Sequence, residues 1–297
     1  MPAEPRGPVA LATCAAFPEL DDDDQLLRTA LRDADIDAEC VVWDDPAVDW
    51  TRFALTVVRD TWDYVDRCGA FLDWASRVPR LCNEAPVLRW NTDKRYLDEL
   101  HQRGVPIVPT TWLTPGADPQ GLRIDGEVVI KPTVSAGSRN TERYGAAEHE
   151  EARRHVARLL ADGRTVMVQP YIHGVEAQGE TALLYINGEY SHAARKAAIL
   201  VQRNVAGEAL FAAESITPHI ATDAERAAGD RVLGALPFDR SSLLYARVDL
   251  VPADDGTPVV LEVELTEPSL FFRCDDEAAA RMAAAVGRRL LRRAPRV

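Results

Sequence analysis

The chain contains 297 residues, of which 46% are hydrophobic and 27% charged, close to the average for soluble globular proteins and unlike a disordered or low-complexity chain. This length favours two α/β units, one of them divided. The formal net charge of −13 disfavours nucleic acid and anionic membranes as partners, because binding by counterion release requires a basic surface. No stretch approaches the roughly 18 apolar residues that a membrane-spanning helix needs.

The cysteines and the N-terminal residues indicate whether the protein is secreted or stays in the cytoplasm. The five cysteines are scattered and contain no C-x-x-C pair, so they indicate neither a disulfide framework nor a zinc site. The apolar stretch 8–17 resembles the core of a signal peptide, but the residues before it include one Arg and one Glu and make a poor basic segment. We therefore interpret this stretch as a buried first strand and expect a cytoplasmic protein.

Residues 1–88 alternate between strand and helix patterns, which predicts an N-terminal α/β domain with a parallel sheet. The expected strands are 9–13, 39–43, 53–58 and 80–83, and the expected helices begin at 21–24 and cover about 71–78. The four aspartates at 21–24 resemble a metal cluster. Acidic residues are also favourable in the first turn of a helix, and we interpret the run in this second way.

Residues 89–297 follow a different pattern. A helix is predicted from Asn91, as its N-cap, to Gly104, as the residue after its end. Residues 109–168 then include a compact unit of strand 127–131, a Gly/Ser loop, helix 149–160 and strand 165–169. Two hairpins follow, joined at Asn187-Gly188 and at Asp254-Asp255-Gly256, both strong turn signals. An Ala/Arg-rich helix from about Asp275 closes the chain.

Three carboxylates are predicted to converge on one face of the second hairpin. Glu262 and Glu264 flank Val263 in a strand, so the period of two places both acids on the same face. Asp249 lies on the partner strand. Three acids at this spacing repel one another unless a hard cation neutralises them, and oxygen ligands without His or Cys suit Mg²⁺. A solvated strand face is the alternative interpretation.

Two further segments suit a nucleotide. Lys131 ends a buried strand and precedes a loop of small residues, 133–138, so its ammonium and the loop N–H groups can contact phosphates, although no Walker A motif is present. The segment 169–172 leaves the compact unit and can place backbone groups on an adenine edge, while Glu176 accepts ribose hydroxyls. Ordinary loops and connectors are the alternatives in both places.

In this order, the segments resemble the ATP-grasp superfamily, in the branch of D-alanine–D-alanine ligase and glutathione synthetase, over about 91–292. The resemblance implies an ATP-grasp fold with an N-terminal α/β domain, a small lid subdomain at about 109–168 and a C-terminal, mostly antiparallel sheet domain. It implies ATP and Mg²⁺ as cofactors. The nucleotide contacts it implies are Lys94, Lys131, Ser135, Ala136, Gly137, Ser138, Gln169, Pro170, Tyr171, Ile172 and Glu176.

The catalytic and metal positions follow from the same resemblance. The sequence R-V-D at 247–249 resembles that of D-alanine–D-alanine ligases, which implies Arg247 on the transferred phosphoryl group and Asp249 on magnesium. Glu262 and Glu264 occupy the metal positions of the family's E-x-N motif. Glu264 departs from the pattern because it replaces the usual Asn and adds a negative charge. Gln169 likewise stands where a Glu is common.

Four strings, VVRDTWDY, RWNTDKRYL, INGEYSHAARK and ELTEPSLFF, resemble bacterial enzymes related to the ligase that closes O-ureido-D-serine to D-cycloserine. This resemblance predicts that a carboxylate is activated as an acyl phosphate and attacked by a nitrogen of the same molecule. An intermolecular amino-acid or peptide ligase and a non-catalytic nucleotide-binding regulator remain as alternatives. The intact Lys94, Lys131, Arg247 and carboxylates argue against the regulator.

Further candidates are assigned by position. Arg195 and Lys196, at the end of a hairpin strand, are expected to hold phosphate or carboxylate, with exposed basic residues as the alternative. Open α/β sheets bind ligands at the carboxyl ends of their strands. The substrate contacts expected on this ground and near the last strand are Arg59, Asp60, Thr61, Trp62 and Ser269. The expected partner is a small amino-acid-like molecule; the sequence leaves a homodimer open.

Overall fold

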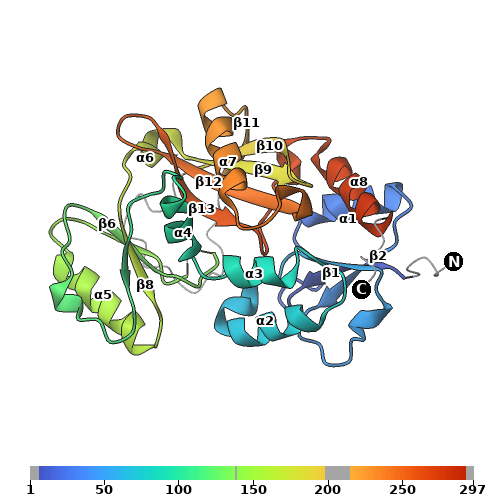
Figure 1. The fold of residues 1–297 in the computed structure, drawn as a ribbon, viewed down its shortest axis with the longest axis horizontal. Helices are drawn as coiled ribbons and strands as arrows, with labels where there is room; N and C mark the ends of the chain where they lie inside the picture. Colours follow the sequence, from blue (N-terminus) through green and yellow to red (C-terminus); the bar gives the residue numbers. More distant parts are fainter. Residues whose placement is uncertain (1–6, 138, 198–214, 292–297) are drawn as a thin grey trace.

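The computed structural model describes residues 7–137, 139–197 and 215–291, which form three sheets (Figure 1). The first sheet has the order β2-β1-β3-β4, and its neighbouring strands are parallel, as predicted. Its strands and helices are β1 (Val9–Thr13), α1 (Asp24–Asp33), β2 (Ala38–Val42), β3 (Leu55–Val58), α2 (Cys68–Arg77) and β4 (Leu81–Cys82). β1 and β3 are buried along their whole length, which explains their continuous apolar sequences.

The second sheet is antiparallel and lies in the middle of the molecule, with the order β11-β10-β9-β12-β13. Its strands are β9 (Glu180–Ile186), β10 (Glu189–Lys196), β11 (Ile216–His219), β12 (Tyr245–Pro252) and β13 (Pro258–Glu264). Both predicted hairpins are confirmed. The strand β11 and the helix α7 (Asp223–Ala235) were not predicted from the sequence, although Thr222 and Glu225 form a capping box at the start of that helix.

The third sheet, with the order β5-β8-β6-β7, forms a lobe at one end of the molecule (Figure 1). Its strands are β5 (Thr111–Leu113), β6 (Val128–Pro132), β7 (Glu142–Tyr144) and β8 (Val166–Pro170). Helix α5 (His149–Ala161) contributes Val156 and Leu159 to a core cluster with Val128 and Ile130 of β6. The lobe therefore has a hydrophobic core of its own.

Several short segments connect the sheets. The remaining α-helices are α3 (Ala85–Asn91), α4 (Tyr96–Gln102), α6 (Gly174–Gln178) and α8 (Ala278–Leu291), and 3-10 turns lie at Trp50–Arg52, Trp62–Asp66, Pro119–Gly121, Arg240–Ser242 and Phe272–Cys274. The prediction of one helix with Asn91 as N-cap is wrong, because Asn91 ends α3 and α4 begins only at Tyr96. The Asn91 side chain instead donates to Val263 O at 2.7 Å and accepts from Leu265 N at 2.7 Å.

The first and second sheets share one hydrophobic core. A single cluster of buried side chains joins Leu11 of β1, Leu184 of β9 and Met282 of α8. In Figure 1, α8 lies beside α1, and the two helices pack together. The C-terminal helix therefore holds the N-terminal sheet against the central one.

The aspartates at the start of α1 make tertiary contacts, so their interpretation as favourable first-turn charges was incomplete. Asp24 and Arg59 form a two-hydrogen-bond ion pair at 2.7 and 3.1 Å, with side chains only 2% and 1% exposed. Arg59 also donates to Pro268 O at 2.9 Å. Asp23 accepts from Phe272 N at 2.8 Å. These contacts fasten the chain after β13 to the edge of the first sheet.

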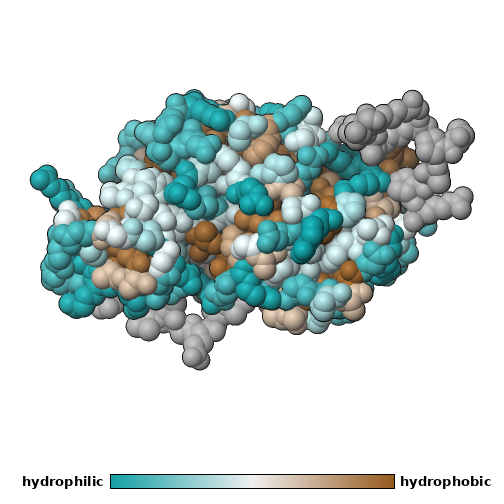
Figure 2. Space-filling view, turned by 60° about the horizontal axis from the view of Figure 1, so that its bottom comes forward, coloured by the Kyte–Doolittle hydropathy of each residue, from teal (hydrophilic) through white to brown (hydrophobic). Residues whose placement is uncertain are grey.

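The surface agrees with the acidic, hydrophilic composition. On the face drawn in Figure 2, hydrophilic residues predominate and hydrophobic ones gather in small patches. Within the part of the chain that the structure describes, no helix is both long and apolar enough to cross a membrane.

We predict that Arg59→Met destabilises the fold by roughly 3–5 kcal/mol, because it leaves Asp24 buried without its partner. The measurement is urea unfolding followed by circular dichroism. Arg52→Met is the control, because the Arg52 side chain is 46% exposed and water screens its pair with Glu39, so this variant should be nearly as stable as wild type. A variant as stable as wild type with only a raised KM would make Arg59 a substrate contact instead.

Candidate active site

A cavity of about 490 Å³ is lined by residues from all three sheets and their connections. The first sheet contributes the loop and turn residues Phe17, Asp21, Trp62 and Tyr64. Predicted site residues that line the cavity are Lys94, Lys131, Ser135, Ala136, Gly137, Gln169, Pro170, Tyr171, Ile172, Lys196, Arg247, Asp249, Glu262, Glu264, Trp62 and Ser269. Segments from the first sheet, the lobe and the last hairpin, far apart in the sequence, therefore meet at one place.

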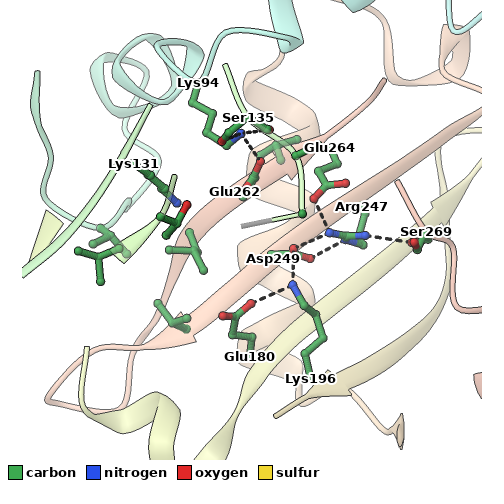
Figure 3. Close-up of a pocket in the computed structure, with 18 of the residues that line it drawn as sticks. Lys94, Lys131, Ser135, Glu180, Lys196, Arg247, Asp249, Glu262, Glu264 and Ser269 are labelled. Atoms are coloured by element: carbon green, nitrogen blue, oxygen red, sulfur yellow. Dashed lines mark hydrogen bonds and ion pairs between the residues drawn. The ribbon is translucent and has the colours of Figure 1, made fainter. Parts of the chain in front are cut away.

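The register of the β12–β13 hairpin sets the polar side of the cavity. Arg247 lies opposite Glu264, and Asp249 lies opposite Glu262. All four side chains share one face because residues two apart in a strand point the same way. Figure 3 shows them facing the cavity. The prediction that Glu262, Glu264 and Asp249 share a face is confirmed.

Buried acids and bases of this face are joined in a continuous network (Figure 3). Arg247 Nε donates to Asp249 Oδ1 at 2.9 Å, and a second guanidinium nitrogen contacts Glu264. Lys196 Nζ lies 3.1 Å from Asp249 Oδ2 and 2.9 Å from Glu180 Oε2. Both side chains of each pair are largely removed from water. The attraction between their opposite charges offsets the free-energy cost of this desolvation.

Lys94 and Glu262 form a separate ion pair that reaches the small lobe. The Lys94 Nζ lies 3.0 Å from Glu262 Oε1 and donates to Ser135 O at 2.8 Å. Ser135 belongs to the small-residue loop after β6, so this contact connects that loop to the central sheet. Of the loop predicted to contact phosphates, Ser135, Ala136 and Gly137 line the cavity. Ser138 lies outside the described residues.

Lys131 differs from the other basic residues of the cavity. It is 8% exposed, and no ion pair or hydrogen bond of its ammonium is found within the described part of the chain. Burial lowers its pKa, with the charges of Lys94 and Lys196 adding to the effect and Glu262 opposing it. A buried ammonium facing a cavity is suited to an anionic ligand.

The chain has only three lysines, Lys94, Lys131 and Lys196, and all three line this cavity. All other basic residues, apart from the histidines, are arginines. An ammonium is a compact charge on a flexible stem, whereas arginine presents a planar fork. The sequence therefore held a further signal for this site, because its few lysines are confined to the segments that line the cavity.

The acids of the cavity differ in pKa because their surroundings differ. Burial alone would raise the pKa of Asp249, but Arg247 and Lys196 hold it below its usual range. Lys94 and Lys131 likewise outweigh burial and lower the pKa of Glu262. Burial raises the pKa of Glu264 to about 7 despite the opposing charge of Arg247. Glu264 is the member of this set that departs from the family pattern.

The three predicted magnesium ligands do not converge on one point. Among the described residues, the acids whose ligand oxygens all lie within 4.8 Å of one another are Asp21, Asp24 and Asp60. There, burial and the neighbouring Asp24 raise the pKa of Asp60 to about 9, so a proton and Arg59 offset the charge. In the β12–β13 hairpin, the carboxylates are instead paired with basic side chains. The donor set of Asp249, Glu262 and Glu264 still fits a hard divalent cation, because it offers only carboxylate oxygens.

The other end of the cavity is apolar. A small hydrophobic cluster lines it with side chains from the linker after α4, the lobe, the connector after β8 and the β12–β13 hairpin. Its members at the cavity are Val108, Val129, Tyr171, Ile172, Val175, Val251 and Leu261. Gln169 is buried beside them and donates to Thr110 Oγ1 at 3.0 Å. Such a surface suits a flat, mostly apolar ring.

Some predicted site residues lie away from the cavity lining. Glu176 is exposed on α6 and pairs with Arg143 at 2.8 Å. Arg195 donates to Gln178 O at 2.8 Å and lies near Glu225. Arg59 is part of the interior ion pair described above, and Asp60 and Thr61 are buried next to it.

Three acids that line the cavity, Asp21, Glu180 and Glu267, were not predicted as site residues from the sequence. Glu180 lies directly opposite Lys196 in the β9–β10 hairpin. The Asn187-Gly188 turn limits the register of that hairpin, so the sequence held a signal for this position. Glu267 follows the last strand in an irregular segment, and no periodicity indicates which way such a residue points.

Solved structures similar to this chain share one architecture. The crystal structure of D-cycloserine synthetase DcsG matches with a TM-score of 0.84 and 37% identity, covering 96% of this chain and 100% of that chain. The ATP-grasp ligase PsnB, complexed with minimal precursor, Mg and ADP, matches with a TM-score of 0.63 and 15% identity over 96% and 98%. D-alanine–D-alanine ligase from Bacillus anthracis, complexed with ATP, matches with 0.60 and 15% over 96% and 97%.

The predicted ATP-grasp fold is therefore confirmed. A family model described as "D-cycloserine synthetase DcsG, N-terminal domain" matches residues 9–83. "Cycloserine biosynthesis protein DcsG" from Streptomyces lavendulae is 39% identical over 308 residues, covering 96% of this chain and 99% of that protein. The chain belongs to the DcsG family, which confirms the resemblance drawn from the four sequence strings.

We predict that Lys131→Ala weakens ATP binding by roughly 1.5–3 kcal/mol, the usual contribution of a hydrogen bond to a charged group. Isothermal titration calorimetry with Mg-ATP measures the change. Arg154→Ala removes a positive charge from the same lobe at an exposed position of α5, 67% exposed, and should bind ATP as wild type does. An unchanged dissociation constant for Lys131→Ala would remove this lysine from the nucleotide site.

Proposed function

We propose that this chain uses ATP and magnesium to activate the carboxylate of O-ureido-D-serine as an acyl phosphate and closes the molecule to D-cycloserine. The observation that carries the proposal is the likeness to DcsG over nearly the whole of both chains. The cavity supports it, because it combines an apolar end, a row of lysines and a face of carboxylates.

The cavity has an apolar end and a part lined by lysines, and this arrangement suits a nucleoside triphosphate. The apolar end, with Val129, Ile172 and Leu261, offers the adenine ring a flat surface, and Gln169 lies beside it with a polar amide. The ammonium groups of Lys94 and Lys131 lie further along the same cavity, where the phosphates would extend. Glu180 is a carboxylate of the lining that can serve a ribose, since Glu176 is paired with Arg143 outside it.

The ion pairs of the cavity also suit an exchange of partners. Lys94 neutralises Glu262, and Arg247 neutralises Glu264 and Asp249. When phosphate oxygens take up these basic groups, the carboxylates lose their partners in a site where unpaired charge is costly. Divalent cations compensate such carboxylates. We therefore assign Asp249, Glu262 and Glu264 as the residues that hold magnesium once the nucleotide is bound.

Magnesium, when bound, offsets the charge on the phosphoryl oxygens during transfer. Arg247 is fixed by Asp249 and by Ser269 O, 3.1 Å away, so its guanidinium is already oriented for the transferred group. The substrate carboxylate displaces ADP from the γ-phosphorus and becomes an acyl phosphate. The lobe formed by β5 to β8, with its loop at Ser135, is positioned to exclude water that would hydrolyse this intermediate.

Ring formation joins the activated carbon to the nitrogen that is bonded to the side-chain oxygen of the same molecule. Both groups are held in one cavity, so the reaction avoids the entropy cost of bringing two molecules together. The bond from the ring nitrogen to the carbamoyl carbon then breaks: the ring nitrogen takes one proton from the carbamoyl NH₂, and the group leaves as isocyanic acid, which completes D-cycloserine. A separate amine substrate is not needed.

The first prediction from this mechanism concerns the metal site. Glu262→Gln should abolish turnover and leave the protein folded, because the amide keeps the size of the side chain but loses the charge that binds the cation. ADP release is measured at several Mg²⁺ concentrations. Glu189→Gln, at an exposed position of β10, is the matched control. Activity of Glu262→Gln within about threefold of wild type would contradict the assignment.

The second prediction separates intramolecular from intermolecular ligation. With O-ureido-D-serine as the single amino-acid substrate, ADP release should be complete and stoichiometric with product. When its carboxylate is labelled with ¹⁸O, the released phosphate should carry one label, because the acyl-phosphate route leaves one carboxylate oxygen on phosphorus. Unlabelled phosphate with genuine product excludes the acyl phosphate. ADP release only with two separate amino acids would identify an intermolecular ligase.

A further inference from the structure

Two acidic side chains of the cavity, Asp21 and Glu267, take no part in the ion pairs described above. Glu180, Asp249, Glu262 and Glu264 each pair with a lysine or an arginine. Glu267 also lines the cavity and is only 9% exposed, but within the described residues no ion pair of its carboxylate is found. A buried carboxyl without a cationic partner is costly to keep in its charged form.

The position of Glu267 is unusually well fixed. Each of the five consecutive residues from 265 to 269 is held by a side chain from another part of the molecule. The hydrogen bonds are Leu265 N to Asn91 Oδ1 (2.7 Å), Tyr245 Oη to Thr266 O (2.8 Å), Trp62 Nε1 to Glu267 O (3.1 Å), Arg59 to Pro268 O (2.9 Å) and Arg247 to Ser269 O (3.1 Å). An irregular segment fastened at every residue can hold a reacting group in place as a strand does.

Glu267 also lies between two parts of the cavity with different roles. The chain on one side of it ends β13 at Glu264, and the chain on the other side reaches Ser269; both lie around Arg247 in Figure 3. Trp62, which donates to Glu267 O, and Tyr64 line the same cavity. Glu267 therefore lines the cavity from the segment that joins Glu264 and Ser269, both of which contact Arg247, the residue assigned to the transferred phosphoryl group.

We propose that Glu267 is the catalytic base that takes the proton from the attacking nitrogen during ring closure. This inference rests on the proposed cyclisation. The nitrogen bonded to the side-chain oxygen carries one hydrogen. As its lone pair forms the bond to the acyl carbon, that proton passes to the Glu267 carboxylate, and the carbon–oxygen bond to phosphate breaks with its electron pair on the departing phosphate. Glu267 then returns the proton to solvent.

The surroundings of Glu267 fit this task. Burial raises its pKa to about 8, and the charge of Glu264 adds to the rise, while Lys94 and the Tyr64 hydroxyl oppose it. A general base is most effective when its pKa lies near the working pH, because a useful fraction is deprotonated and its affinity for the proton is high. The paired carboxylates Asp249 and Glu262 have lowered pKa values and are weaker bases.

The test compares wild type with Glu267→Gln in two reactions of O-ureido-D-serine with Mg-ATP. The first is D-cycloserine formation, which needs the internal nitrogen to lose its proton. The second is trapping of the acyl phosphate by added hydroxylamine, measured as the hydroxamate; this nucleophile is strong enough to react without a protein base. Thermal unfolding and ATP affinity check that the variant is folded.

We expect Glu267→Gln to lower D-cycloserine formation by about 100-fold or more, the usual effect of removing a general base, while hydroxamate formation stays near the wild-type rate. Glu277→Gln, whose side chain is 86% exposed, is the matched control and should behave as wild type in both reactions. Undiminished cyclisation by Glu267→Gln would overturn the inference. Equal loss of hydroxamate and D-cycloserine would also overturn it, because Glu267 would then serve binding or phosphoryl transfer.

The same experiment separates this inference from the proposed function. If wild type releases no ADP with O-ureido-D-serine, the cyclisation itself is wrong and the role of Glu267 fails with it. If wild type forms D-cycloserine and only the expected difference between the two reactions is missing, the proposed function stands and Glu267 alone is excluded as the base.

Discussion

The pairing of acids with bases across the β12–β13 hairpin is the interaction on which the site depends. Arg247 faces Glu264 and Asp249 faces Glu262 because the register of the two antiparallel strands sets them opposite one another. Lys94, just before α4, and Lys196 of β10 reach the same acids. These charges lie in a cavity shielded from water, where each would be costly alone, so the folded protein keeps its catalytic groups as mutual counterions. We propose that a nucleotide and its cation replace one set of partners with another.

The surrounding structure supports this hairpin. The central sheet places β12 between β9 and β13, so its charged face is bordered by the lysine and glutamate of the β9–β10 hairpin. The first sheet, held by α8 and by the buried pair of Arg59 and Asp24, fixes the chain that follows β13. The small lobe brings Lys131, the loop at Ser135 and the apolar connector to the opposite wall. The walls proposed to bind substrate, phosphates and adenine thus come from three sheets and their connections.

The features that could be predicted from the sequence are those that follow from local periodicity. Alternation along 262–264 and the turn at Asp254-Asp255-Gly256 were enough to place the acids on one face, and Lys131 was recognised because it ends a buried strand. The resemblance to the ATP-grasp superfamily supplied the order of the segments. Features created by tertiary contacts were not predictable in this way. Asn91 looked like a helix cap but binds the chain after β13, Arg59 looked like a ligand contact but lies in an interior ion pair, and Glu267 sits in a segment without periodicity. The sequence also did not predict that the three carboxylates of the hairpin pair with basic side chains instead of lying within ligand distance of one another.

The exchange of counterions is tested most directly by the affinity for ATP with and without magnesium. Calorimetric titration of the wild-type chain with ATP, first in Mg²⁺ and then in a chelating buffer, measures it. If phosphates take Lys94 and Arg247 away from Glu262 and Glu264, the carboxylates need the cation, and ATP alone should bind at least about tenfold more weakly, or about 1.4 kcal/mol. Equal affinity in the two buffers would contradict the account, because it would mean that the nucleotide binds without disturbing the ion pairs of the hairpin.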